Sequence, residues 1–360
     1  MSSHKIEAIA RATGLTLLGD GSLTVRGAAE PANAEADELA LAMSPSYADA
    51  LRGSRARTAV VWGEIDLQEF GLEAALVASR PRIALAGITA AFQHQSDIAP
   101  GIHPSAIVEQ GAEIGEGAAI GAFAVIGAGA RLGPGAVVGA HATIGSEAVI
   151  GDKALLHAGV RIGARCKIGA RFIAQPNAVI GADGFSFEPS DPASSARAAG
   201  HDTASDSNAD TRKWLRIHSL AGVEIGDDVE IGSGACIDRG TIAPTRIGSG
   251  TKIDNLVQIG HNVQVGRDCL LCAQVGIAGS TVIGDRAVIG GKVGIPDHVK
   301  IGADVVIAAG SLVAGNLAGQ AIYMGIPAVP RMQALRQMNM VRRLPELATE
   351  LARIREKLGL

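Results

Sequence analysis

Two histidines stand where their spacing could support proton-transfer chemistry. His261, in Ile-Gly-His-Asn-Val, follows a large aliphatic residue by two positions, and His298, in Ile-Pro-Asp-His, lies 37 residues further on. Aliphatic residues recur around both at every sixth position, so the aliphatic side chain should face inward and His261 outward. Because an imidazole changes its charge near neutral pH, it can act as a general base. Each histidine is therefore either a functional group or a solvated surface side chain.

The same spacing relates the two histidines to each other. If three six-residue repeats form one coil, two coils span about 36 residues, which places both histidines near one face, roughly 10 Å apart at strand spacing. A solenoid has no pocket of its own, so a ligand must bind in a groove between neighbouring chains or under an added loop. Function therefore implies oligomerisation, and the closed symmetry of a triangular prism favours a homotrimer.

Other motifs that could carry chemistry have structural explanations. Cys269-Leu-Leu-Cys272 imitates a redox or zinc motif, but Cys269 and Cys166 share a phase of the repeat at which small residues face inward. Gly266 stands where a zinc site would need a second histidine after His261. The glycine-rich stretches contain no GxxxxGK[ST] motif and follow the six-residue period. We therefore predict no metal and no cofactor.

The repeat that must position these residues covers most of the chain. Large aliphatic residues occupy nearly every sixth position from Ile102 to Ile180, and the register returns from Ile225 to Ile237. It slips by four residues at Arg239 to Ile242 and then runs unbroken from Ile247 to Val313. Such a period fits a solenoid in which each repeat forms a short flat side and a corner, where glycine should relieve the turning backbone. The predicted fold is mainly β, a parallel β-helix of hexapeptide repeats.

Residues 1–98 lie outside this repeat. Ser2 or Ser3 could cap a helix that runs over Ile6 and Ile9 and ends at Gly14. Two short runs typical of strands follow, at Thr58–Trp62 and Arg82–Leu85. We therefore expect a small N-terminal α/β domain over 1–98, followed by the β-helix domain over 99–320.

The β-helix domain is expected to carry an insertion, and helices should follow it. Residues 188–212 contain a stretch rich in Ser, Ala, Asp and Pro, which predicts a mobile excursion from one corner. After an extended segment that ends at Pro330, apolar spacing predicts two helices, Arg331–Arg343 and Pro345–Lys357. Together these make a C-terminal helical extension over 321–360.

Composition excludes several classes of function. The 360 residues include 47 glycines and only 3% aromatics, which suits a thin core of small and branched side chains. A net charge of −4 gives no general attraction to nucleic acid or to an anionic membrane. The N-terminus lacks the pattern of a signal peptide, and no apolar run is long enough to span a membrane. Four cysteines in a chain of this length suit reduced cytosolic thiols, so we expect a cytoplasmic location.

Several longer motifs together resemble one known family, and they extend over nearly the whole chain. They are Gly19-Asp-Gly, Ser44-Pro-Ser-Tyr47, Gly101-Ile-His-Pro-Ser, Ile180-Gly-Ala-Asp-Gly-Phe-Ser-Phe187, Ile237-Asp-Arg-Gly-Thr241, Asp254-Asn-Leu-Val-Gln-Ile-Gly-His-Asn-Val263, Gly279-Ser280 and Gly325-Ile-Pro-Ala. The chain resembles the UDP-3-O-(3-hydroxyacyl)glucosamine N-acyltransferases of bacterial lipid A synthesis. The most specific part is DRGT followed by DNxVQIxHNV, behind an N-terminal domain of roughly 100 residues. The resemblance implies a left-handed β-helix.

The resemblance also implies a reaction and roles for individual residues. A 3-hydroxyacyl chain would move from an acyl carrier protein thioester to the 2-amino group of UDP-3-O-acylglucosamine, in a ternary complex and without a coenzyme. His261 would be the general base, and the backbone N–H of Gly279 the oxyanion donor. Asp254 would orient or support the imidazole of His261. His298 would contact the substrate phosphate or the carrier's phosphopantetheine.

Substrate contacts follow from the same resemblance. In the family the N-terminal domain holds the uridine, and Tyr47 matches one aromatic residue of that site. Leu41 stands where an aromatic residue is common and Ser44 where Asn is usual, which implies weaker stacking and altered hydrogen bonding to uracil.

Further contacts are predicted near the acceptor sugar, the acyl chain and the carrier protein. Asp183, Phe185 and Gln258 lie in the matching motifs and are predicted to bind substrate, and Leu312 is expected near the end of the acyl chain. Arg331–Arg343 carries four arginines and no acidic residue, so it is either a solvated face or a docking patch for the acidic carrier protein.

Other functions remain possible on sequence alone. The related UDP-N-acetylglucosamine O-acyltransferases begin their β-helix almost at the N-terminus, so residues 1–98 argue against that family. A nucleotide-sugar N-acetyltransferase that uses acetyl-CoA, and a non-catalytic or metal-binding trimer, are the remaining alternatives.

Overall fold

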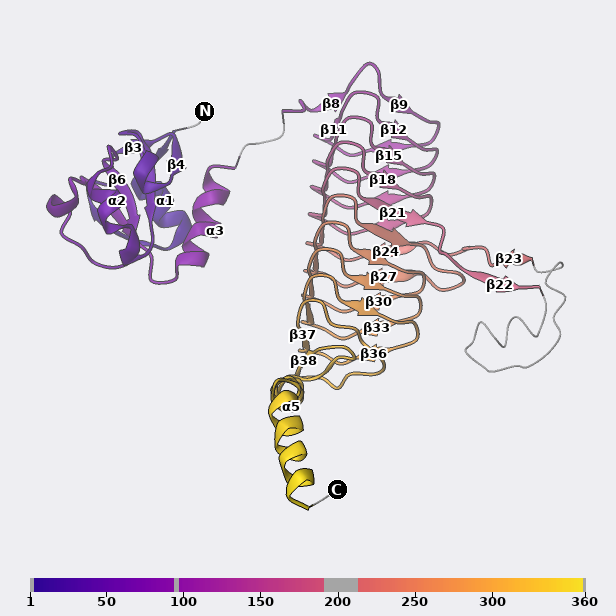
Figure 1. The fold of residues 1–360 in the computed structure, drawn as a ribbon. Helices are drawn as coiled ribbons and strands as arrows, with labels where there is room; N and C mark the ends of the chain where they lie inside the picture. The colour runs from indigo at the N-terminus through magenta and orange to yellow at the C-terminus, as the bar shows by residue number, and fades with distance from the viewer. Residues whose placement is uncertain (1–2, 94–96, 191–212, 359–360) are drawn as a thin grey trace. The chain divides into compact units, whose positions relative to one another are not determined.

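The computed structural model describes residues 3–93, 97–190 and 213–358, which form two compact units, Met1–Ser96 and Asp97–Leu360 (Figure 1). Most of the insertion predicted over 188–212 lies outside the described residues. No helix in these ranges has both the length and the apolar character needed to cross a bilayer.

The first unit is built around a five-stranded sheet in the order β2-β7-β6-β5-β4, antiparallel at β2 and otherwise parallel. The strands are β2 (Thr16–Gly19), β7 (Ala74–Val77), β6 (Thr58–Val61), β5 (Glu38–Ala42) and β4 (Gly27–Ala29), with a small pair β1 (His4–Lys5) and β3 (Thr24–Val25) beside them. The helices are α1 (Ile6–Thr13), η1 (Pro31–Asn33), η2 (Pro45–Tyr47), α2 (Ala48–Arg52), η3 (Gln68–Phe70) and α3 (Pro81–Ala91). The central strand β6 is buried along its whole length, so the sheet forms the middle of the core.

Two local expectations for this unit are wrong. Helix α1 ends at Gly14 in the left-handed conformation, as predicted, but its N-cap is Lys5 and no serine caps it, because β1 precedes the helix directly. The run Arg82–Leu85 belongs to helix α3. Pro81 opens that helix, and Ala84 and Ile88 are buried one turn apart, a spacing that four residues are too short to reveal.

The second unit is a parallel β-solenoid of three sheets, and each coil visits them in the order I, II, III (Figure 1). Sheet I contains β8 (Gly101–Ile102), β11 (Ala119–Ile120), β14 (Val137–Val138), β17 (Leu155–Leu156), β20 (Ile173–Ala174), β25 (Glu230–Ile231), β28 (Lys252–Ile253), β31 (Leu270–Leu271), β34 (Val288–Ile289), β37 (Val306–Ile307), β38 (Ile322–Met324) and β39 (Val329–Pro330). Sheet II contains β9 (Ile107–Val108), β12 (Val125–Ile126), β15 (Thr143–Ile144), β18 (Arg161–Ile162), β21 (Val179–Ala182), β26 (Cys236–Asp238), β29 (Gln258–Ile259), β32 (Gly276–Ile277) and β35 (Gly294–Ile295). Sheet III contains β10 (Glu113–Ile114), β13 (Arg131–Leu132), β16 (Val149–Ile150), β19 (Lys167–Ile168), β24 (Val223–Ile225), β27 (Thr245–Ile247), β30 (Gln264–Val265), β33 (Val282–Ile283) and β36 (Lys300–Ile301).

Two stacked columns of inward side chains form the solenoid core. The repeating aliphatic residues make the first, and small residues two positions earlier make the second, for example Ala142 before Ile144. Cys166 and Cys269 are buried in the column of small residues, which confirms the position predicted for them. The predicted repeat fold is therefore confirmed, with each coil burying its own layer of apolar surface.

The glycine after each aliphatic residue has a different role from the one expected. At Gly145 a Cβ atom would lie 2.5 Å from the backbone nitrogen of Ala164 in the next coil, and φ is not left-handed there. The left-handed residue of each turn comes two positions later, and it is often not glycine, as at His141 and Lys153. Close approach of successive coils, rather than turn conformation, therefore selects these glycines.

Two excursions leave the solenoid at the corner between sheets II and III. The first carries the antiparallel hairpin of β22 (Phe187–Pro189) and β23 (Trp214–Arg216), which extends away from the coils (Figure 1). The second, residues 239–244, is the register slip of the sequence, and it joins β26 to β27.

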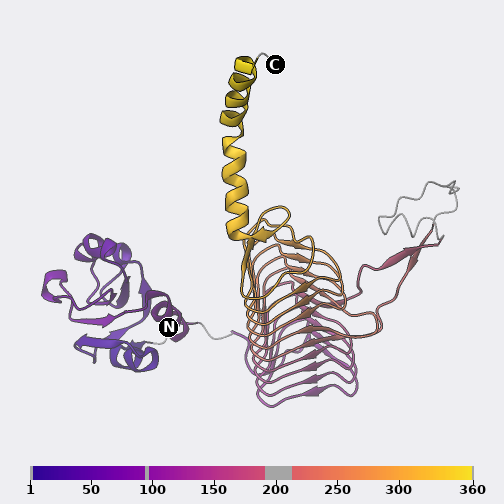
Figure 2. The same cartoon turned by 90° about the horizontal axis from the view of Figure 1, so that it is seen from below.

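The chain ends in one long helix, α5 (Arg331–Leu358), which follows β39 (Figure 2). The expectation of two helices is wrong because the helix continues through Pro345. Proline there cannot donate a hydrogen bond to the carbonyl of Val341, one turn earlier, yet the surrounding turns keep their helical bonds.

Candidate active site

One corner of the solenoid brings the two histidines together. The segments that join sheet II to sheet III, which we call the II–III corner, contain His261, Gly279 and His298 in successive coils. The Ser280 N–H donates to the carbonyl of His261 at 2.9 Å, and the His298 N–H donates to the carbonyl of Gly279 at 3.1 Å. The histidines therefore lie on one corner, as their spacing predicts.

The imidazole of His261 is half-buried between two glycines. A Cβ atom on Gly184 would lie 2.7 Å from His261 Cβ and 3.0 Å from Cδ2. A Cβ atom on Gly279, in the next coil, would lie 2.7 Å from Cε1 and 2.8 Å from Nε2 of the same ring. Because any larger residue on either side would displace the ring, these glycines define a slot that fixes its plane.

Asn262 determines which nitrogen of His261 carries the proton. Its Nδ2 donates to the carbonyl of Ala243 at 2.7 Å, and its Oδ1 accepts from the Thr241 N–H at 3.1 Å, so the orientation of the amide is fixed. His261 Nδ1 lies 3.0 Å from that Oδ1, which can only accept a hydrogen bond. Nδ1 is therefore the protonated nitrogen of the neutral ring, and Nε2, which faces Gly279, is free to accept a proton.

The register slip provides the groups that hold Asn262. Thr241 and Ala243 both lie in the segment 239–244, and the Asn262 N–H donates to Thr245 Oγ1 at 2.9 Å at the end of this segment. Arg239 anchors the other end, since its Nη2 donates to the carbonyl of Ala164 at 2.6 Å. The four-residue slip, which had no role in the sequence pattern, thus builds the support for the histidine.

The backbone N–H of Gly279 is a candidate donor to an oxyanion. Among the described residues it donates to no acceptor, although the neighbouring Ala278 and Ser280 N–H groups both do. A free backbone N–H next to a general base can stabilise the negative charge that develops on a carbonyl oxygen during acyl transfer.

An apolar groove of about 680 Å³ lies on the outer face of sheet II, near this corner. Gly276 and Gly294 occupy outward positions of β32 and β35, and a Cβ atom on Gly276 would find no atom within 4 Å. Gln258 of β29 and Leu312 also line the groove, so both lie where a substrate chain could contact them. Because its lining is almost entirely apolar, the groove can hold an apolar group.

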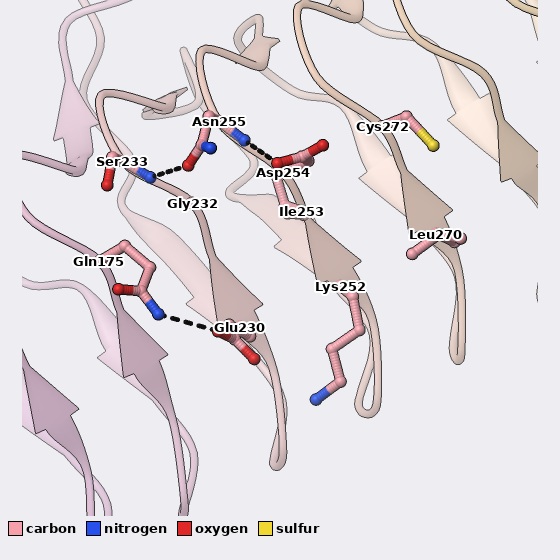
Figure 3. Close-up of a pocket in the computed structure, with 10 residues that line it drawn as sticks. All are labelled: Gln175, Glu230, Gly232, Ser233, Lys252, Ile253, Asp254, Asn255, Leu270 and Cys272. Carbon is pink, nitrogen blue, oxygen red and sulfur yellow. Dashed lines mark hydrogen bonds between the residues drawn. The ribbon is translucent and has the colours of Figure 1, made fainter. Parts of the chain in front are cut away.

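Asp254 does not lie at this corner. It follows β28 of sheet I, is exposed, and accepts a hydrogen bond from the Asn255 N–H at 2.7 Å. It lines a separate pocket of about 500 Å³ together with Lys252 and Glu230. Figure 3 shows these side chains. Within one chain the imidazole of His261 is held by Asn262 and not by Asp254, so the supporting role of Asp254 stays a prediction.

The remaining predicted residues of the second unit surround the corner. His298 and Asp183 are exposed, and Phe185 is 87% exposed at the start of the hairpin. The Phe185 ring packs edge-on against Phe187 at 5.0 Å, and the Arg216 guanidinium lies 4.6 Å from the centre of the Phe187 ring. This aromatic cluster is linked to the site because Gly184, directly before Phe185, packs on His261.

The residues predicted to contact uridine belong to the first unit. Tyr47 is 45% exposed at the end of η2, and Ser44 caps that helix by accepting the Ser46 N–H at 3.4 Å. Leu41 packs against the core of the unit. A surface aromatic ring and a nearby hydroxyl are thus available on this unit, while Leu41 is a core residue.

Three of the four thiols lie away from the corner. Burial raises the pKa of Cys166 and of Cys269, which makes both poor nucleophiles. Cys272 lines the pocket that contains Asp254. In the part of the chain that the structure describes, no group of three or more potential ligands is placed to hold a metal ion.

Three residues of the site were missed from the sequence: Gly184, Asp238 and Asn262. Asn262 directly follows the predicted base, and Asp238 opens the DRGT motif, so both stood inside motifs already noted. The slip hid the groups that hold Asn262 and the nearness of Asp238 to His261, because it makes Cys236 pair with Gln258 rather than with a residue 18 positions later.

Comparison with known proteins agrees with this architecture. Residues 111–146, 123–158, 244–279 and 280–315 match the family described as bacterial transferase hexapeptide (six repeats). The solved structure of Arabidopsis UDP-N-acetylglucosamine acyltransferase aligns with 66% of this chain and 76% of its own, with a TM-score of 0.52 and 22% identity, which shows the fold alone. The solenoid and its histidine corner therefore define the chain as a hexapeptide-repeat transferase.

Closer relatives define the family. A UDP-3-O-acylglucosamine N-acyltransferase of Ruegeria pomeroyi is 56% identical over 275 residues, which is 76% of each protein. One of Paracoccus denitrificans is 54% identical over 274 residues, 76% of this chain and 74% of the relative. The chain belongs to the family of UDP-3-O-acylglucosamine N-acyltransferases.

Proposed function

We propose that this chain transfers a 3-hydroxyacyl group from an acyl carrier protein thioester to the 2-amino group of UDP-3-O-acylglucosamine. The observation that carries this proposal is the free Nε2 of His261 beside the unpaired N–H of Gly279, close to an apolar groove. A base, an oxyanion donor and a site for a hydrocarbon chain are what direct acyl transfer to an amine requires.

The reaction proceeds in a ternary complex. The amine nitrogen attacks the thioester carbon while His261 Nε2 takes a proton from that nitrogen, and the Gly279 N–H stabilises the oxyanion. As the carbon–sulfur bond breaks, the imidazolium returns a proton to the leaving sulfur. Asn262 keeps Nδ1 protonated throughout, so Nε2 is the nitrogen that accepts and returns the proton.

Further residues bind the rest of the substrates. The acyl chain of the donor lies in the groove over Gly276 and Gly294 and reaches toward Leu312. His298 contacts a phosphate or the phosphopantetheine from the coil next to Gly279, and Asp183, Phe185 and Gln258 bind around the acceptor sugar. Tyr47 and Ser44 of the N-terminal α/β domain bind the uracil ring. Asp254 supports the His261 imidazole of a neighbouring chain in the assembled oligomer.

A homotrimer is supported by the chemistry of the three outer faces. Sheet III presents charged side chains, among them Arg246 and Glu224, which form an ion pair at 2.9 Å. Sheet I carries Glu230 and Lys252 but otherwise presents mostly apolar side chains, including Leu270 at 44% exposed and Val306 at 36%. A charged face suits solvent, whereas apolar sheet I can cover the groove on sheet II of a neighbouring chain and so enclose the acyl chain.

Helix α5 is the proposed docking site for the acyl carrier protein, which is itself acidic and cytoplasmic. Arg331, Arg336, Arg342 and Arg343 lie in its first half, and none of them forms an ion pair with another described residue. Unpaired arginines on an exposed helix attract an acidic partner and accelerate its association.

The proposed reaction is tested by identifying its product. The chain is incubated with 3-hydroxyacyl carrier protein and UDP-3-O-acylglucosamine, and mass spectrometry is expected to detect an amide with a second acyl chain. An ester formed from UDP-N-acetylglucosamine under the same conditions would instead support an O-acyltransferase.

Filling the groove should shorten the preferred acyl chain. In Gly276→Leu the new side chain has room in the groove, so we expect the fold to be kept and kcat/KM for a long-chain donor to fall at least about tenfold. Activity with a short-chain donor should be largely retained. Thr143→Leu, on the same face of sheet II in an earlier coil, is the control and should change neither value. An equal loss for both donors would place the acyl chain elsewhere.

A further inference from the structure

Asp238 is an unusual buried side chain. Among the described residues only seven polar side chains are buried, and Asp238, at 9% exposed, is the only one of them with an ionisable group. Ser219 and Thr245, also buried at the II–III corner, each accept a backbone N–H, from Gly184 and Asn262. Two of these three buried groups thus support the backbone around His261. No hydrogen bond from a backbone N–H to the Asp238 carboxylate is found among the described residues.

The position of Asp238 places it at the reaction centre. It is the last residue of β26, which pairs with β29, so it lies beside the strand that leads from Gln258 to His261. The Gln258 side chain hydrogen-bonds to its carboxylate, and His261 is close enough to interact with it electrostatically. Asp238 therefore lies beside both a residue that lines the acyl groove and the proposed base.

No resident cation compensates the charge of Asp238. In the described part of the chain it forms no ion pair with lysine or arginine, and the adjacent Arg239 extends to the carbonyl of Ala164. Burial raises the pKa of the Asp238 carboxyl, while the hydrogen bond from Gln258 and the nearness of His261 oppose that rise. A buried carboxylate without a cationic partner is costly unless a ligand brings the complementary charge.

We propose that Asp238 binds the 2-amino group of the acceptor in its ammonium form, and so selects an amine acceptor over a hydroxyl acceptor. This inference rests on the proposed function and names the residue that recognises the acceptor nitrogen. An ammonium group is a compact cation with three donors, which suits a carboxylate beside a hydrogen-bonding amide. Asp238 holds this group within reach of His261 Nε2.

The protons balance with Asp238 remaining ionised. The bound ammonium first gives one proton to His261 Nε2, which releases it to solvent and leaves a neutral amine. After the nitrogen has bonded to the thioester carbon, His261 takes a second proton from it. That proton goes to the sulfur as the carbon–sulfur bond breaks, so one amide, one thiol and one free proton are formed.

The test compares an acceptor that carries the charge with one that does not. In Asp238→Asn, which keeps the shape of the side chain, the Kd of UDP-3-O-acylglucosamine is expected to rise about ten- to hundredfold. The Kd of the N-acetylated analogue, which has no ammonium group, should change less than about threefold. Asp304→Asn removes an exposed carboxylate paired with Arg286 at another corner and should alter neither value.

Each outcome decides the proposal. An equal loss of affinity for both ligands would make Asp238 a structural residue, and unchanged affinity for the amine would refute its role directly. If Asp238→Asn does not fold, the proposal can still be tested with the wild-type chain. Its Kd for the 2-hydroxy analogue of the acceptor should be at least about tenfold higher than its Kd for the amine. Equal binding of the two would overturn the proposal, whereas a wild-type chain that forms no amide product would overturn the proposed function instead.

Discussion

Replacing His261 with alanine is expected to lower kcat at least about hundredfold while KM for both substrates changes little. A general base contributes about 10²–10⁴-fold, or roughly 3–5 kcal/mol of transition-state stabilisation. No other described side chain at the corner can take its place, because His298 lies beyond Gly279 and is exposed to solvent. The measurement is steady-state turnover with acyl carrier protein as donor.

The control for this variant is another histidine of the solenoid. His141 is exposed at the corner between sheets I and II and has a left-handed φ of 58°, which asparagine tolerates. His141→Asn should keep full turnover, and both variants should sediment as the same oligomer as the parent chain. Normal kcat in His261→Ala would remove the general base from the mechanism.

Replacing Gly279 with alanine is expected to lower kcat by about 10²–10³-fold. The new Cβ atom would lie 2.7 Å from Cε1 and 2.8 Å from Nε2 of His261, so the ring must leave the position that Asn262 gives it. The same side chain would crowd the space beside the Gly279 N–H. Loss of an oxyanion donor costs about 10²–10³-fold, and displacement of a base that acts together with that donor adds less than its separate effect.

The variant Gly184→Ala separates displacement of the His261 ring from obstruction of the Gly279 N–H. It crowds the same imidazole from the opposite side but adds no atom beside the Gly279 N–H. We therefore expect a smaller loss, about tenfold in kcat, with the melting temperatures of both variants close to that of the parent. If Gly184→Ala were as damaging as Gly279→Ala, the oxyanion role of the Gly279 N–H would have no support.

The two tests isolate different parts of one arrangement. His261 supplies the proton acceptor, whereas the two glycines supply the space that sets its position relative to the substrate carbonyl. A variant that keeps the histidine but moves it should lose kcat without losing acyl-donor affinity, since the groove on sheet II is formed by other residues.

The amino-acid sequence by itself determined the solenoid and the position of its histidines. A strict six-residue period allows only one side of each repeat to face inward, so Ile259 had to be buried and His261 had to lie at a corner. The same period placed His298 on that corner and Cys269 in the core. Local signals were less decisive outside the repeat, where Arg82–Leu85 fits a strand or a helix equally well.

Only the tertiary structure decided how the site is supported. Gly184 contacts His261 from the start of the hairpin excursion, Asp238 lies beside it across an interrupted register, and Asn262 is held by the four-residue slip. None of these contacts keeps a constant spacing in the sequence. The family resemblance implied that Asp254 supports His261, yet in a solenoid the seven positions that separate the two residues lead around to another corner. A periodic sequence specifies which way each side chain faces, but contacts between coils depend on how many residues each corner contains.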